Sequence, residues 1–231
     1  MQGRRLFSAL AAAGLMLVGG AVQALELSYG GTAGVSVTAN SSTGGSNQLV
    51  SRYTAGTMTY QDRAGNSFAA FCVEPSQRFA NGANGFVDFT IGSFSAATEA
   101  RLEALYSTSF ASTVGNSAQA AAFQLAIWEI VNEAPGQPMS LAFGSGSIYL
   151  TGTHVGNAAQ NLAMTNTLRA SAQSMLTAAQ NYTGPNLYQV SYLSNGTFQD
   201  MVIAQAVPEP ATYALMGLGL LVIGLRKRRQ D

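Results

Sequence analysis

The chain has 231 residues and a formal net charge of zero at pH 7. Both ends are basic, and the body between residues 25 and 206 holds five arginines, no lysine and nine acidic residues, which leaves it at −4. A mildly acidic body argues against nucleic-acid binding, and its length of about 180 residues suits one domain with a hydrophobic core.

The first 24 residues have the pattern of a secretory signal peptide. Arg4 and Arg5 precede an apolar run that ends in Val22-Gln23-Ala24. Small residues at the end of such a run are typical of a signal-peptidase site. We therefore expect cleavage after Ala24 and an exported protein.

Short strands are expected over much of the next 70 residues. Apolar and small residues alternate from Ala33 to Val37, and further β-prone runs follow near Tyr53, at 58–60 and at 67–73. The polar segments 40–47 and 81–85 predict loops, and 62–66 predicts a hairpin turn. Residues 86–91 form one more strand candidate.

Three helices are expected after these strands, near 95–110, 117–134 and 157–181. The residues expected to be buried on the first and third helices are Leu102, Leu105, Tyr106, Leu162, Leu168, Met175 and Leu176. Further strands are expected at 148–150, 188–193 and 198–204, with a turn at 194–196. The sequence thus predicts a single α+β domain of short antiparallel strands packed with about three helices.

The helix at 117–134 contains an amide side chain on its apolar face. Asn116 or Ser117 can cap its start, and Gln124 shares a stripe with Ile127 and Trp128. We therefore expect Gln124 to be buried. A buried carboxamide without partners costs about 1–3 kcal/mol, so Gln124 must be hydrogen-bonded or must react.

Cys72 is the only cysteine in the sequence. An exported protein with one cysteine has no internal disulfide, so Cys72 is a buried apolar side chain, a free thiol, an intermolecular bridge or a group that reacts within the chain. It lies in Phe71-Cys72-Val73-Glu74-Pro75, at the end of an expected strand.

These two segments resemble the thioester domain of bacterial surface adhesins. In that family a cysteine in an aromatic-Cys-apolar-acidic-Pro context bonds to a glutamine in a Gln-x-Ala-Ile-Trp helix. The resemblance implies a thioester between Cys72 and Gln124. The residues around the bond would be Phe71, Glu74, Pro75, Phe123, Ile127 and Trp128, with Phe71, Phe123 and Trp128 excluding water from it. Phe123 stands where the family usually has Thr.

Such a bond implies covalent adhesion to an amine or hydroxyl on a surface ligand or exopolysaccharide. It requires no cofactor, and the chain is then not an enzyme. One alternative is a structural matrix protein without a reactive thioester. Another is a hydrolase that uses Cys72 with His154, the only histidine. One cysteine and one histidine without clustered acidic residues do not predict a metal site.

The C-terminal segment 207–231 resembles the PEP-CTERM sorting signal. Val207-Pro208-Glu209-Pro210 precedes an apolar stretch of about 15 residues and a basic end from Arg226 to Arg229. The resemblance implies a Gram-negative protein that the C-terminal helix holds transiently in the inner membrane. An exosortase would process it near Pro208, Glu209 and Pro210 and deliver it to the cell surface or extracellular matrix. A simple tail anchor is the alternative, and it leaves the Pro-Glu-Pro sequence unexplained.

Overall fold

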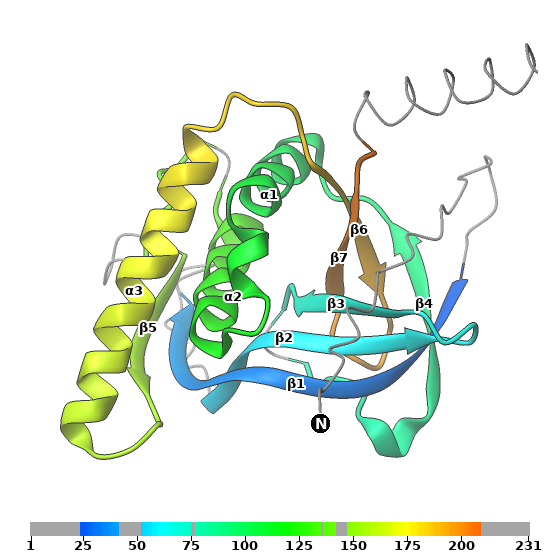
Figure 1. The fold of residues 1–231 in the computed structure, drawn as a ribbon, viewed down its shortest axis with the longest axis horizontal. Helices are drawn as coiled ribbons and strands as arrows, with labels where there is room; N and C mark the ends of the chain where they lie inside the picture. The colour runs from blue at the N-terminus through cyan, green and yellow to red at the C-terminus, as the bar shows by residue number, and fades with distance from the viewer. Residues whose placement is uncertain (1–23, 42–51, 75–76, 135, 142–146, 209–231) are drawn as a thin grey trace, which may run out of the picture.

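The computed structural model describes residues 24–41, 52–74, 77–134, 136–141 and 147–208 (Figure 1). Within these ranges three helices pack together on one side of a seven-stranded antiparallel sheet (Figure 1). The predicted single α+β domain with about three helices is confirmed.

The strands close most of the sheet into a ring. They are β1 (Ala24–Ser41), β2 (Arg52–Asp62), β3 (Ser67–Cys72), β4 (Phe86–Gly92), β5 (Ile148–Thr153), β6 (Tyr188–Ser194) and β7 (Met201–Ala206). Their order is β2-β3-β7-β6-β4-β1-β5, and β1 also pairs with β2. Six strands therefore form a closed circuit, and β5 adds to the free part of β1.

The first strand is longer than the short runs expected from the sequence. Along one edge, residues 27–38 of β1 pair with β2. Along the other edge, its start pairs with β4 and its end with β5. One strand of 18 residues thus serves three partners, and a local apolar pattern does not contain that information.

The helices α1 (Ala96–Ser109), α2 (Ser117–Asn132) and α3 (Ala158–Gln180) lie where the sequence predicts them. Their first turns are capped by the side chains of Ser95, Asn116 and Asn157, each of which accepts a backbone N–H. Two short 3-10 segments (Gly82–Asn84 and Phe110–Thr113) complete the elements of the described chain.

The central helix α2 is buried on all sides over most of its length. Every residue from Ala120 to Ile130 is buried, because α2 contacts β1 and β2 as well as the other two helices (Figure 1). Three consecutive alanines at its start allow the neighbouring elements to approach closely. A helix without a solvent face belongs to the core, which holds the site described below.

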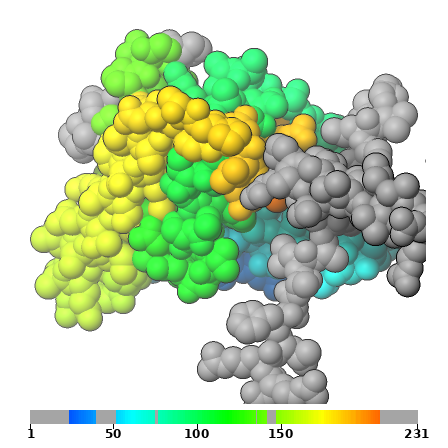
Figure 2. Space-filling view, turned by 45° about the horizontal axis from the view of Figure 1, so that its top comes forward, coloured from blue at the N-terminus to red at the C-terminus, as the bar shows by residue number. Residues whose placement is uncertain are grey.

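Two details of the prediction are wrong. Leu162 is 62% exposed, because the buried stripe of α3 runs instead through Thr165, Leu168 and Ala172. Figure 2 shows α3, in yellow, along the surface of the molecule. The turn expected at 194–196 is also longer, since β7 begins only at Met201.

The loop between β6 and β7 is held by its own polar side chains. Asp200 accepts the backbone N–H of Asn195, and Asn195 accepts those of Thr197 and Phe198. Residues 198–200 therefore belong to this loop and not to a strand. As a result, Gln199 lies at the end of the sheet, beside the end of β3.

Candidate functional site

Cys72 is the last residue of β3, between β2 and β7. It pairs with Met201 across the sheet, and the next backbone N–H, that of Val73, donates to Asp200 O at 3.0 Å. The side chain of Cys72 is 7% exposed. Its Sγ lies 2.6 Å from Gln199 Oε1 and 3.9 Å from Met58 Sδ.

Gln199 is held in place by two further hydrogen bonds. Its backbone N–H donates to Arg78 O at 2.9 Å, and its Nε2 donates to Glu74 O. The side chain is 5% exposed. The carboxamide is therefore fixed with its oxygen, and hence its carbonyl carbon, beside the thiol.

Gln124 is fully buried, as the sequence predicts, but it contacts a different part of Cys72. Its Oε1 accepts the backbone N–H of Cys72 at 2.9 Å, and its Nε2 donates to the backbone carbonyl of Cys72 at 2.7 Å. Both ends of the amide are thus used by the Cys72 backbone. The expectation that the thiol meets Gln124 is corrected, because the side chain in contact with Sγ is that of Gln199.

The sequence carries little signal for Gln199. The residue follows Phe198 shortly before a buried strand, and nothing local pairs that strand with β3, which lies 127 residues earlier. Knowledge that β3 pairs with β7, and in which register, would have placed Gln199 beside Cys72. Such a register depends on which strands are neighbours in the sheet, and the hydrophobic pattern of each strand leaves this open.

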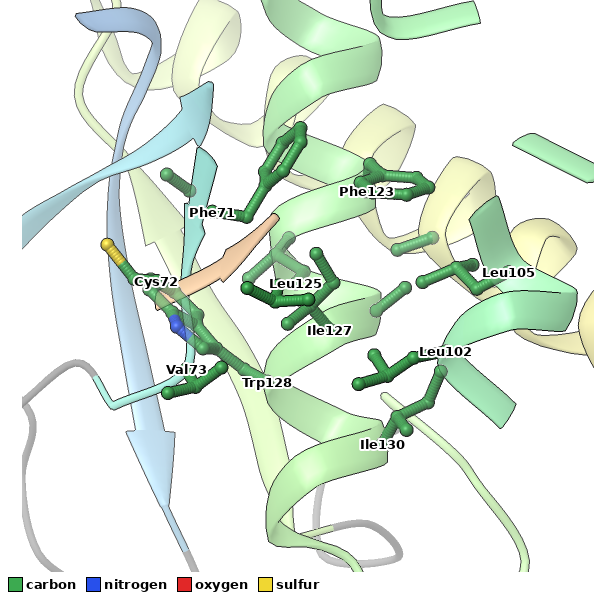
Figure 3. Close-up of a cluster of buried hydrophobic side chains, with 14 of the residues drawn as sticks. Phe71, Cys72, Val73, Leu102, Leu105, Phe123, Leu125, Ile127, Trp128 and Ile130 are labelled. Atoms are coloured by element: carbon green, nitrogen blue, oxygen red, sulfur yellow. The ribbon is translucent and has the colours of Figure 1, made fainter. Parts of the chain in front are cut away.

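The aromatic residues expected around the thiol divide between two places. Phe71 and Phe123 have ring centroids 4.9 Å apart and pack with Tyr106 and Phe110. Neighbouring strand residues point to opposite faces, so this cluster does not cover the thiol. Figure 3 shows Trp128 beside Cys72, with Phe71 and Phe123 further into the core.

Two further residues expected around the bond, Ile127 and Glu74, lie in the core and just after β3. Ile127 is fully buried in the core. Glu74 is partly buried, and burial together with the carboxyl group of Asp200 raises its pKa. Pro75 lies outside the described residues.

The thiol and Gln199 open onto a cavity of about 800 Å³. Met58 and Trp128 line it together with Cys72, and the rest of its lining includes Arg52, Arg78 and several aromatic and polar residues. Trp128 is 1% exposed, and its indole Nε1 has no hydrogen-bond partner among the described residues. Cys72 and Gln199 thus lie in the wall of a cavity that has the volume of a small-ligand site.

Burial raises the pKa of the Cys72 thiol to about 12. The thiol is therefore protonated at neutral pH and does not act as a free thiolate. Its contact with Gln199 Oε1 is therefore that of a neutral S–H donor.

The other candidate chemistries lack the required contacts. The ring Nε2 of His154 lies 2.8 Å from Thr38 Oγ1 at the exposed end of β5, so it does not pair with the buried thiol. In the described ranges, no group of three or more His, Cys, Asp or Glu side chains is arranged to hold a metal ion.

Most of the two terminal segments lies outside the described residues, including residues 1–23, Glu209, Pro210 and the apolar stretch after them. Ala24 begins β1, and Pro208 is exposed after β7. None of the helices that the structure describes is long and apolar enough to cross a membrane.

Comparison with solved structures finds several similar proteins, among them two from Streptococcus pyogenes and one from Bacillus anthracis. The N-terminal domain of the Streptococcus pyogenes pilus tip adhesin Cpa is 11% identical, with a TM-score of 0.45, and the match covers 86% of this chain and 100% of that one. The N-terminal thioester domain of fibronectin-binding protein SfbI from Streptococcus pyogenes is 14% identical, with a TM-score of 0.39 and coverage of 66% and 86%. The Bacillus anthracis TIE protein is 15% identical, with a TM-score of 0.38 and coverage of 79% and 31%.

Sequence comparison adds a match at the C-terminus. No curated protein is significantly similar to the chain. Residues 206–229 match the PEP-CTERM protein-sorting motif, which confirms the resemblance seen in the tail. Such a motif implies export, anchoring in the membrane before processing, and processing by an exosortase.

Proposed function

We propose that this protein is an exported surface or matrix adhesin whose Cys72 and Gln199 form an internal thioester that captures a nucleophile on a partner. The observation that carries the proposal is the 2.6 Å contact between Cys72 Sγ and Gln199 Oε1 at the wall of a cavity. Processing by an exosortase after export would deliver it to the cell surface or the extracellular matrix.

Formation of the bond needs no oxidant or cofactor. Cys72 Sγ attacks the side-chain carbonyl carbon of Gln199, the carbon–nitrogen bond breaks, and the thiol proton leaves with the nitrogen as ammonia. Burial favours the neutral thiol, so transfer of the proton to the leaving amide nitrogen accompanies the attack. The fixed geometry supplies the proximity that the reaction requires.

Gln124 is better suited to position Cys72 than to react with it. Its two hydrogen bonds hold the backbone of Cys72 on both sides, at the N–H and at the carbonyl. Conversion of Gln124 to an acyl group would remove the Nε2 donor and leave a buried carbonyl unpaired, which costs about 1–3 kcal/mol. Gln199 loses only the donor to Glu74 O at the edge of the loop.

The formed bond is an electrophile for a partner group. An amine or hydroxyl attacks the same carbonyl carbon, the carbon–sulfur bond breaks, and the proton returns to the Cys72 sulfur. The product is an amide or ester between the Gln199 side chain and the partner. The absence of lysine from residues 25–206 removes internal amines that would compete in this step.

The mass of the purified, exported protein tests the proposal. We expect a deficit of one ammonia relative to the mature sequence, and uptake of methylamine should replace the deficit by one methylamine adduct on Gln199. Cys72→Ala and Gln199→Ala should each abolish the deficit. Full sequence mass in the wild-type protein, with a thiol that reacts normally after unfolding, would contradict the proposal.

The variant Gln124→Ala separates the two glutamines. If Gln199 supplies the acyl group of the thioester, tryptic peptides of methylamine-treated protein should carry the adduct at Gln199. Folded Gln124→Ala protein should carry the same adduct. A deficit that disappears in Gln124→Ala but persists in Gln199→Ala would assign the bond to Gln124. A deficit without any uptake of methylamine would favour the structural matrix protein, in which the bond only stiffens the domain.

A further inference from the structure

We infer that the cavity at Cys72 accepts an anionic, hydroxyl-rich ligand, namely a segment of an acidic glycan that carries carboxylate groups. The inference rests on the proposed thioester and names the chemical class of its partner. At about 800 Å³ the cavity lies within the usual range of small-ligand sites, about 300–1,000 Å³.

The charge of the cavity is opposite to that of the body. Arg52 and Arg78 line it, and no acidic side chain of the described residues does, although the body as a whole carries −4. The internal segments outside the described residues add no acid, since 42–51, 75–76, 135 and 142–146 contain no charged residue. A protonated amine would meet two positive charges, whereas a carboxylate would be attracted by both.

Among the described residues, neither arginine is paired with a carboxylate. The ion pair found among the described residues joins Arg63 to Glu26 at the surface. Arg52 Nε donates to Ser36 Oγ at 2.8 Å, and the Arg78 guanidinium lies 5.4 Å from the centroid of the Phe198 ring. Each guanidinium keeps N–H groups for a ligand, and a guanidinium binds a carboxylate through two parallel hydrogen bonds.

The neutral groups of the cavity also favour a ligand rich in acceptors. The side-chain oxygens of Asn81 and Asn84 already accept backbone N–H groups. Their amide nitrogens are the atoms that remain to donate.

The aromatic residues of the cavity favour a saccharide over an acidic peptide. Tyr29 and Phe79 pack with ring centroids 5.3 Å apart, and Phe79 is 41% exposed. Tyr53 and Phe198 add two further rings to the lining. Flat apolar rings beside hydrogen-bond donors match a pyranose, which has C–H groups on its faces and oxygens on its rim.

The covalent step follows from the same groups. A sugar hydroxyl oxygen bonds to the Gln199 carbonyl carbon, the carbon–sulfur bond breaks, and the hydroxyl proton goes to the Cys72 sulfur. The product is an ester, and the sugar carboxylates are not consumed.

Binding of galacturonic acid trimers to the exported full-length protein tests this inference. In titration calorimetry at low salt, trigalacturonate should bind at least about tenfold more tightly than the neutral galactose trimer, which corresponds to one additional charge-assisted interaction of about 1.4 kcal/mol. Arg52→Gln and Arg78→Gln should each lose about that tenfold. Arg101→Gln removes the same charge from α1, outside the cavity, and should bind like wild type.

Methylamine uptake separates this inference from the proposed function. The three arginine variants should keep the ammonia deficit and the uptake of methylamine, because they retain Cys72 and Gln199. Equal binding of the two trimers in a protein that takes up methylamine would overturn the acidic ligand and leave the thioester intact. Tighter binding of a glutamate-rich peptide than of trigalacturonate would overturn the assignment to a glycan.

Discussion

Gln124 and Gln199 present the same carboxamide to Cys72 but to different atoms of it. Gln124 bonds the backbone N–H and carbonyl, while Gln199 places its oxygen at the sulfur. A carboxamide that is saturated by backbone groups holds the strand end in position. In the proposed thioester the carboxamide in contact with the thiol is the one that reacts, so hydrogen-bond partners and not residue type separate the two roles.

Gln124→Ala should destabilise the fold more than Gln199→Ala does. In a Cys72→Ala background, which removes the covalent bond from the comparison, loss of Gln124 leaves two buried backbone groups unpaired. We expect the free energy of unfolding to fall by about 2–4 kcal/mol, measured by urea denaturation. Gln199→Ala removes one hydrogen bond at the loop and should cost about 1 kcal/mol. Equal losses in the two variants would contradict the positioning role of Gln124.

At the site, the sequence alone identifies Cys72 as the single cysteine, predicts the burial of Gln124 and carries the resemblance of both segments to thioester domains. It does not predict the contact of Gln199 with Cys72, because that contact exists only once β3 and β7 are neighbours. A helical stripe is a local property of the chain. The pairing of distant strands depends on the whole sheet, and this explains why the sequence points to Gln124 and not to Gln199 as the side chain at the thiol.

At the scale of elements, α2 organises the loop that leads to β5 through a buried carboxylate. Glu129 is fully buried and accepts the backbone N–H groups of Ser140 and Ile148, each at 2.8 Å. Burial, together with the nearby carboxyl group of Glu133, raises the pKa of Glu129 to about 7. The helix thus holds a titratable group whose protonation differs between the folded and unfolded chains near neutral pH.

This group should make the fold less stable as pH rises from about 5 to 8. In that range the folded protein keeps the Glu129 proton up to about pH 7, while the unfolded chain has already lost it near 4.5. Removing protons therefore favours the unfolded state. Urea denaturation should show a smaller decline between pH 5 and pH 8 for Glu129→Gln than for the wild type. An unchanged decline in the variant would assign the pH dependence to other groups.

The contact between β1 and β2 requires glycine at Gly34. A Cβ built at this position would lie 2.1 Å from Ala55 O, a backbone atom that cannot move without displacing β2. Gly34→Ala should therefore lower the free energy of unfolding by about 1–3 kcal/mol. Gly152→Ala in β5 is the matched control, since nothing lies within 4 Å of its added Cβ. Similar stabilities of the two variants would show that the strands can separate at little cost.

The helices follow from the sequence more completely than the strands do. Caps at Ser95, Asn116 and Asn157 and the apolar stripes are local signals, and all three helices lie within a few residues of their predicted bounds. The closed strand order and the long β1 depend on pairings across the chain. The loop at 195–200 differs from the expected tight turn because Asn195 and Asp200 bond its backbone groups.

At the scale of the whole molecule, the last described strand and the Pro-Glu-Pro sequence follow one another along the chain. The last strand ends at Ala206, and Val207 N still donates to Leu187 O at 2.8 Å. Pro208 follows as an exposed residue. The described sheet therefore ends before the Pro-Glu-Pro sequence, which lies inside the matched sorting motif at 206–229.

Deletion of residues 208–210 should therefore block processing without unfolding the domain. We expect the variant to remain in the membrane fraction at its unprocessed size, while wild-type protein reaches the cell surface or the medium. The ammonia deficit should persist in the variant, because Cys72, Gln124 and Gln199 precede the deletion. Exchange of Pro208 alone for Ala controls for the change in length, since it keeps Glu209 and the spacing to the apolar segment. If the deletion variant had the mature size and location of the wild type, a recognition sequence elsewhere in the tail would have to direct processing.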